Sequence, residues 1–195
     1  MENKEKLFLT VQKLRLDCAK KQKKGLHFIL TSVGIWIGIM MIHLSPLPII
    51  TKNLLTFFCS VPLMPIAYFV AKLIKVDFQN KGNPLTNLGI LFSVNQILYI
   101  LIAMWVYSST PNKMLMVYAI IFGAHLLPYG WLYRSKTYYA FSIMLPLLSL
   151  AIGLNFSPAI LAMIMVFAES IFCISLLIEN KKLFSASRMN DVKTP

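Results

Sequence analysis

Long apolar runs, separated by short polar stretches, set the pattern of this chain. Each run has roughly the length that an α-helix needs to cross a hydrocarbon core of about 30 Å at 1.5 Å per residue. The pattern predicts an all-α, polytopic integral membrane protein, a six-transmembrane-helix bundle. The predicted spans are residues 26–44, 53–74, 88–107, 114–133, 138–154 and 159–179.

Two polar segments flank the predicted transmembrane domain of residues 26–179. Residues 180–195 are interpreted as a cytoplasmic polar tail, because they carry no hydrophobic pattern. Residues 1–25 form a basic amphipathic segment, which predicts a helix on the membrane surface with its lysines facing anionic lipid headgroups. A solvated basic arm is the alternative. The apolar positions of this segment recur at helical spacing: Leu7, Val11, Leu14 and Cys18.

Composition supports the membrane assignment. The chain is 57% hydrophobic and 13% charged, with a mean hydropathy of +0.68, whereas soluble domains are about 25% charged. The net charge of +12 does not predict a nucleic-acid partner, since the basic residues lie between the apolar runs. No small-residue cleavage site follows the first run, so we expect it to remain as an anchor.

The distribution of lysine and arginine predicts the orientation. With six spans, 17 of the 19 basic residues lie on the side of the N-terminus, and only Lys52 and Lys113 lie on the other. Positive residues favour the cytoplasmic side. We therefore predict a multi-pass protein with both termini in the cytoplasm.

Three cysteines carry no pattern typical of a metal site or a disulfide framework. Cys59 and Cys173 lie within apolar runs, and Cys18 lies in the basic segment. We expect no structural disulfide, no metal site and no cofactor.

Glu169 is the outstanding polar residue, because it lies at the middle of the last apolar run. A charged side chain at that depth costs at least about 2.5 to 3.5 kcal/mol on insertion scales, and such residues usually face a bundle interior or a wet cavity. Asn95, Gln96 and His125 lie within about three residues of the centres of their spans, hence within about 5 Å of the same depth. The sequence therefore predicts a polar midplane site on the third, fourth and sixth spans.

Such a site has definite chemistry. Glu169, paired with His125 or donating to an amide, is a candidate proton carrier, and Asn95 and Gln96 are candidate orienting groups. The alternative is structural, because buried amides and histidines often hold transmembrane helices together. Two aromatic hydroxyls, each one turn from a polar residue, extend the candidate site: Tyr99 and Tyr129.

Prolines suggest a second feature. Paired interrupted helices in the two halves of a transporter often build a midplane site, so the sequence raises the hypothesis of 3+3 inverted halves. Prolines are also common in membrane helices, which is the simpler explanation. His27 and His43 lie near the two membrane faces and are interpreted as interfacial residues. The helix-breaking prolines are Pro62, Pro65, Pro128 and Pro146.

Two stretches, NPLTNLGILFSVNQILY at residues 83–99 and GAHLLPYGWLY at residues 123–133, carry a family resemblance. The chain resembles an uncharacterised family of small multi-helix membrane proteins from Gram-positive bacteria. This resemblance implies a bacterial plasma membrane and no known activity. It also draws attention to His125, Pro128, Tyr129 and the two amides of the third span.

Taken together, these features predict a small-solute or proton-coupled transporter or binding protein with a polar midplane site. The main alternative is a non-transporting accessory protein whose polar residues hold helices together. An intramembrane enzyme is the third hypothesis, disfavoured because only one histidine lies at depth and neither HExxH nor GxSxG occurs. A chain of 195 residues can need a second copy to enclose a path, so a homodimer is a candidate partner.

Overall fold

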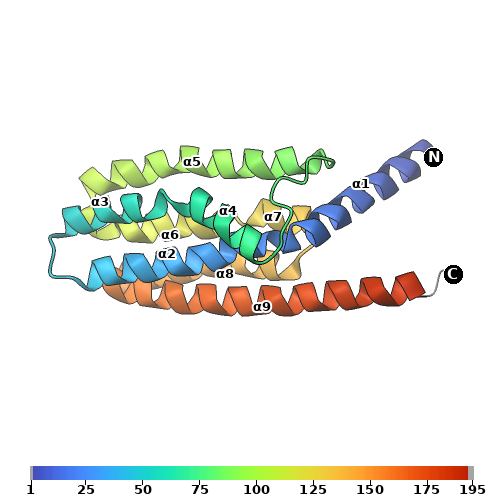
Figure 1. Ribbon diagram of the computed structural model, residues 1–195. Helices are drawn as coiled ribbons and strands as arrows, with labels where there is room; N and C mark the ends of the chain where they lie inside the picture. Colours follow the sequence, from blue (N-terminus) through green and yellow to red (C-terminus); the bar gives the residue numbers. More distant parts are fainter. Residues whose placement is uncertain (1, 193–195) are drawn as a thin grey trace.

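The computed structural model describes residues 2–192, with side chains as far as Ser185, and this part of the chain is built from helices (Figure 1). Two short 3-10 helices, η1 and η2, precede α2 and α6. The elements are α1 (Glu2–Lys21), η1 (Lys23–Gly25), α2 (Leu26–Leu44), α3 (Ile49–Ser60), α4 (Leu63–Leu73), α5 (Leu85–Ser109), η2 (Pro111–Lys113), α6 (Met114–Ala124), α7 (Leu127–Leu132), α8 (Lys136–Asn155) and α9 (Pro158–Val192).

Within the described residues, five helical stretches are long and apolar enough to cross a membrane, or six if a bent pair counts as one span. The five are residues 23–44, 85–109, 111–132, 136–155 and 158–185. The bent pair is α3 and α4, which meet at an angle of 41°. Pro62 lies at this break, where its missing amide proton ends the helical ladder. The predicted break in the second apolar run is confirmed.

The spanning helices lie side by side, with α2 packed on α3, α4 and α9, and α6 packed on α5 and α8 (Figure 1). Two glycines allow α6 and α8 to approach closely, as small residues do between membrane helices. A Cβ on Gly123 would lie 2.6 Å from Cδ of Pro146, and one on Gly153 would clash with Cγ of Met116. The largest fully buried side chains include Trp36 and Phe172.

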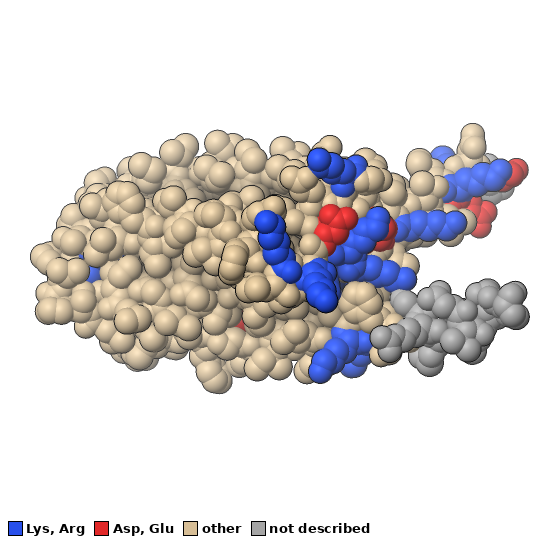
Figure 2. Space-filling model, in the orientation of Figure 1, with Lys and Arg blue, Asp and Glu red and all other residues tan. Residues whose placement is uncertain are grey.

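Basic residues gather at the end of the bundle that carries α1, residues 74–84 and the C-terminal part of α9 (Figures 1 and 2). We call this the basic end. The helix α1 docks there through Cys18 and Ala19, which are buried, whereas Leu7, Phe8 and Leu9 remain exposed. The predicted surface helix therefore has a packing role at its C-terminal turns.

The helix α9 continues past the last predicted span. Residues 180–192 of the predicted polar tail are helical, because α9 runs without a break to Val192. Polar contacts hold α9 where this tail begins: Lys24 Nζ lies 2.7 Å from Glu179 Oε1, and Asn180 Nδ2 donates to the Lys23 carbonyl at 2.9 Å. Residues 193–195 of the predicted tail lie outside the described residues.

Candidate functional site

A cavity of about 1150 Å³ lies between α2, α3, α5 and α6. One helix explains why it exists: α5 packs on α6 and α7 and leaves another stripe of its surface facing the cavity. Three cavity-lining residues of this stripe stand seven apart, which is two turns of an α-helix. They are Ile90, Ile97 and Met104, with exposed fractions of 57%, 62% and 55%.

Polar groups are few along this apolar wall. Tyr118 donates to Ser60 Oγ at 2.6 Å. The Tyr129 hydroxyl lies 2.7 Å from Ser93 Oγ and 2.9 Å from the Gly89 carbonyl oxygen. The Gly89 carbonyl also accepts from Ser93 Oγ at 3.4 Å, so the two hydroxyls and this carbonyl form one cluster. The Tyr129 bonds tie α7 to α5, the Tyr118 bond ties α6 to α3, and together they place hydroxyl groups on the cavity surface.

His125 and Gln96 complete the polar positions near the middle of the cavity. The Nδ1 atom of His125 bonds to the Phe122 carbonyl, so Nδ1 carries the proton and the tautomer is fixed. His125 is half-buried, just beyond the end of α6. Its ring packs edge-on to Tyr129, with centroids 6.0 Å apart.

Glu169 lies one layer behind the cavity wall. It is fully buried in α9, and its Oε2 atom lies 2.6 Å from the Oγ atom of Ser32, a cavity-lining residue of α2. Ser32 Oγ is also 2.8 Å from the Ile29 carbonyl oxygen. One hydroxyl proton cannot serve both acceptors. A protonated Glu169 resolves this, because it donates to Ser32, which then donates to Ile29.

The other carboxyl oxygen of Glu169, Oε1, is not satisfied in this way. Among the described residues, Glu169 Oε1 is buried without a hydrogen-bond partner, and no lysine, arginine or histidine forms an ion pair with this side chain. A carboxylate left unpaired in an apolar interior is costly. The geometry therefore suits a neutral acid between α2 and α9.

The predicted midplane site is assembled only in part. Gln96, His125 and Tyr129 line the same cavity, whereas Asn95 and Tyr99 are exposed and do not line it. Glu169 contacts Ser32 rather than His125, Asn95 or Gln96. The reason is that α9 packs on α2, α6 and α8, while α5 packs on α6 and α7. The position of a residue along its apolar run predicts its height along the bundle, but not which neighbouring helix its side chain faces.

The prolines also differ from the prediction. Pro65 lies within the first turn of α4, just after the break at Pro62, and Pro146 lies inside the unbroken helix α8. Pro128 lies in the first turn of α7, after the chain leaves α6. The breaks therefore fall in the second and fourth apolar runs, which are not corresponding positions of two three-helix halves.

A polar group that the sequence analysis assigned to the interface lies inside the protein. His27 is 1% exposed, lines the cavity at its basic end, and has no partner on either ring nitrogen within the described structure. Phe28 and Phe78 cover it, with centroids 4.3 and 5.3 Å from the imidazole. His43 is buried as well, but its Nε2 atom lies 3.1 Å from Thr56 Oγ1. Both histidines are therefore buried inside the protein, which their positions near the ends of apolar runs did not predict.

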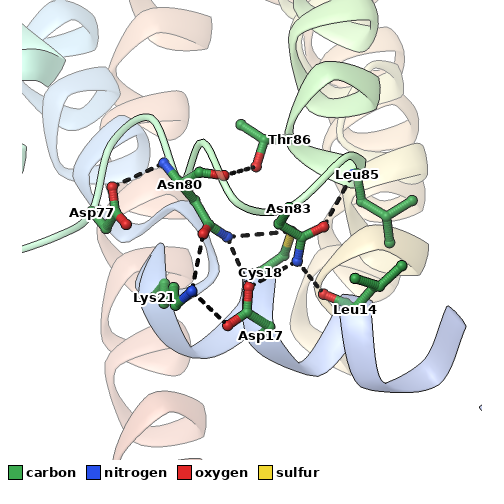
Figure 3. A network of polar contacts seen from close by, with 9 residues as sticks. All are labelled: Leu14, Asp17, Cys18, Lys21, Asp77, Asn80, Asn83, Leu85 and Thr86. Atoms are coloured by element: carbon green, nitrogen blue, oxygen red, sulfur yellow. Dashed lines mark hydrogen bonds and ion pairs between the residues drawn. The ribbon is translucent and has the colours of Figure 1, made fainter. Parts of the chain in front are cut away.

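A network of polar contacts joins residues 74–84, the segment that carries Phe78, to α1 (Figure 3). Asp17 Oδ2 accepts from Asn80 Nδ2 at 3.1 Å and from Asn83 Nδ2 at 2.8 Å. Lys21 Nζ lies 3.0 Å from Asp17 Oδ1. We call Asp17, Lys21, Asn80 and Asn83 the α1 clasp. Asn80 and Asn83 also line the cavity, so the clasp closes its basic end.

The clasp favours a charged Asp17. Burial opposes ionisation, but hydrogen bonds from Asn83, Asn80 and Lys21 outweigh it, and the pKa of Asp17 is lowered from its ordinary value of 3.8. The adjacent Cys18 has a raised pKa, chiefly because the thiol is buried. The structure thus keeps an anionic acceptor for the two amides.

Ser32, His27 and Phe78 are the residues of this region that the sequence analysis missed. Ser32 follows Thr31 within the first apolar run, and adjacent hydroxyls at that depth were a usable signal for a polar contact. His27 and Phe78 had none, because their meeting depends on the path of residues 74–84.

Comparison with known proteins places the chain in a family but assigns no activity. Residues 11–179 match the model of a family of unknown function (DUF7010), and the chain belongs to this family. The match agrees with the resemblance to an uncharacterised membrane-protein family. None of the curated proteins and none of the solved structures with which the chain was compared matches it.

Proposed function

We propose that this protein binds a small, mostly apolar solute in the cavity between α2, α3, α5 and α6 and passes it between the two faces of a bacterial plasma membrane. The observation that carries this proposal is the cavity itself. Its volume of about 1150 Å³ is slightly above the usual range for ligand pockets, about 300 to 1000 Å³. Mostly apolar walls with a few polar groups are typical of such pockets.

The proposed arrangement in the membrane has six spans, with α3 and α4 together forming one. The basic end faces the cytoplasm, because lysine and arginine favour that side. Both termini are then cytoplasmic, and the basic side chains of α1 lie near anionic headgroups. The cavity extends from this level toward the opposite leaflet.

Glu169 is the proposed proton carrier. Its one link to the cavity within the described structure is Ser32, 2.6 Å away. The neutral acid satisfies Ser32 and Ile29 as described above, whereas the carboxylate needs a cation or water at Oε1. Loss of the proton is therefore coupled to opening of the contact between α2 and α9, which moves the Ser32 wall of the cavity.

Two tryptophan variants test whether the cavity binds a solute. Ile97→Trp fills the cavity, while Leu98→Trp changes the next residue of α5, which is 60% exposed and does not line the cavity. The probe is a sixteen-carbon alcohol bearing a diazirine, photolysed with the protein in liposomes. We expect labelled residues on the walls formed by α2 and α3, and a loss of at least fivefold in Ile97→Trp but not in Leu98→Trp. Labelling confined to outward-facing residues of α5 would contradict the proposal.

The proton role has a separate test. Transfer of a fluorescent single-chain lipid between leaflets is followed by dithionite quenching in proteoliposomes, with and without an imposed pH gradient. The gradient should change the transfer rate of the wild type and leave that of Glu169→Gln unchanged. If both proteins respond equally, Glu169 carries no proton in the transfer.

A second function, that of an accessory protein, is favoured by one observation. Leu7, Phe8 and Leu9 are 66%, 61% and 53% exposed on the part of α1 that projects beyond the bundle (Figure 1). Three adjacent exposed apolar residues are suited to a membrane surface or to a protein partner. Replacing all three by serine should then abolish recruitment of that partner while labelling of the cavity persists.

A further inference from the structure

The charge on the cavity lining is of one sign. Among the residues that line it in the described part of the chain, Lys81 is the one with a charged side chain, and none is an aspartate or a glutamate. Lys81 lies at the basic end and is exposed. The amide-bearing Gln79 and Asn87 line the same end. A group bound there meets one cation and the amides of Gln79 and Asn87, since those of Asn80 and Asn83 already donate to Asp17. A lining with one cation and no carboxylate favours an anion.

The cavity is long as well as apolar. On α5 its lining runs from Thr86 to Tyr107, which is about 30 Å at 1.5 Å per residue. This is the thickness of a whole hydrocarbon core. A compact solute does not need such a length, but an extended alkyl chain lying along α5 uses it.

His27 supplies a polar group that could bind a ligand at the same end. Both of its ring nitrogens are buried without a partner among the described residues, and a buried polar group left unpaired is costly. Folding tolerates that cost, and an oxygen-bearing headgroup placed beneath Phe78 would remove it. Phe78 lies on residues 74–84, the segment that the α1 clasp holds against α1 (Figure 3).

We infer that the cavity takes a single-chain amphiphile with an anionic oxygen headgroup, with the chain along α5 and the headgroup at the basic end between His27 and Lys81. This rests on the proposed function and names its class of solute. Phe78 is the gate of this headgroup site. Since the α1 clasp fixes the segment that carries Phe78, release of the clasp uncovers His27.

The test compares three diazirine probes that share one sixteen-carbon chain and differ in headgroup: carboxylate, phosphate monoester and trimethylammonium. Each is photolysed with the full-length protein in liposomes, and labelled cavity residues are quantified by mass spectrometry. We expect the two anionic probes to label the cavity at least fivefold more than the cationic probe. The stronger of the two anionic probes identifies a fatty acid or a phosphate-headed lipid as the source.

Three variants locate the headgroup. Lys81→Gln removes the cation, and Lys136→Gln is its control, an exposed lysine of the basic end that does not line the cavity. His27→Phe keeps an aromatic ring between Phe28 and Phe78. Lys81→Gln and His27→Phe should each lower anionic labelling at least threefold, while Lys136→Gln leaves it unchanged. His27→Gln, which retains a donor and an acceptor, should restore part of the loss.

The outcomes separate this inference from the function on which it rests. If all three probes label the cavity equally and the variants have no effect, the cavity binds apolar chains and the headgroup assignment is wrong. If the sixteen-carbon alcohol and all three probes label only outward-facing residues, both proposals fail. Thermal unfolding of each variant confirms that a loss of labelling comes from a folded protein.

Discussion

The α1 clasp and the bundle interior both contain buried polar side chains, but they satisfy them differently. In the clasp, the buried amides of Asn80 and Asn83 donate to Asp17, which is partly exposed and also pairs with Lys21. In the interior, as far as the described residues go, His27 has no hydrogen-bond partner and Glu169 uses one of its two oxygens. Native structures rarely leave such groups unpaired. The clasp is therefore built for stability, while the interior keeps hydrogen-bonding atoms that the fold leaves without partners.

The largest expected effect on stability comes from breaking the α1 clasp. Asp17→Ala removes the shared acceptor of two buried amides, so the free energy of unfolding should fall by about 1.5 to 3 kcal/mol. Denaturant unfolding in micelles measures this. Glu5→Ala is the control, because Glu5 is an exposed residue of the same helix, and its effect should be within about 0.5 kcal/mol. Equal effects of the two substitutions would mean that the clasp is not stabilising.

Replacing each partner of the contact between α2 and α9 tests how the interior satisfies its polar groups. Ser32→Ala leaves Glu169 with no partner and should cost about 1 to 2 kcal/mol. Glu169→Leu removes the buried acid and leaves Ser32 its bond to Ile29, so it should be nearly neutral or stabilising. The same unfolding assay tests both variants. A cost above about 2 kcal/mol for Glu169→Leu would show that the carboxyl group holds the helices together, as the accessory hypothesis requires.

A smaller effect of opposite sign is expected at His27. His27→Phe removes two unpaired nitrogens and keeps a ring of similar size, so the protein without solute should gain about 1 kcal/mol of stability. His43→Phe is the matched control, and it should lose stability because His43 bonds to Thr56. Loss of stability in both variants would indicate that His27 has a partner in the membrane.

The smallest expected effect is a dependence of stability on pH. The pKa of Asp17 is lowered in the folded protein from its ordinary value of 3.8, so its stabilisation is complete above that value. It is lost as the pH falls through the lower, folded-state pKa. Unfolding measured between pH 5 and about pH 2 should therefore show a decline that is absent in Asp17→Asn. An identical decline in this variant would assign the effect to other carboxyl groups.

The sequence predicted the helices well, because each apolar run is long enough to be read without any tertiary information. It also predicted the break at Pro62, since a missing amide proton acts locally. It predicted less of the site. Glu169 was identified by the free-energy cost of a carboxyl group in a membrane, but its partner depends on which helices α9 contacts. A uniformly apolar helix such as α5 gives no periodic signal of the face that it packs.

His27 shows the same limit at the basic end. Its position near the end of an apolar run is typical of an interfacial residue. It is buried because residues 74–84 fold back and place Phe78 over the imidazole, 5.3 Å between ring centroids. That path is set by contacts between Asp17 and two asparagines that lie more than sixty residues away in the sequence. Such long-range pairs cannot be read from local patterns.

The most direct test of the account is native mass spectrometry of the protein purified from its membrane in mild detergent. We predict that the wild type and Leu98→Trp each carry the added mass of a single-chain acidic amphiphile, and that Ile97→Trp does not. A wild-type protein that carries no added mass, or the same bound mass in all three proteins, would contradict a ligand site in the cavity.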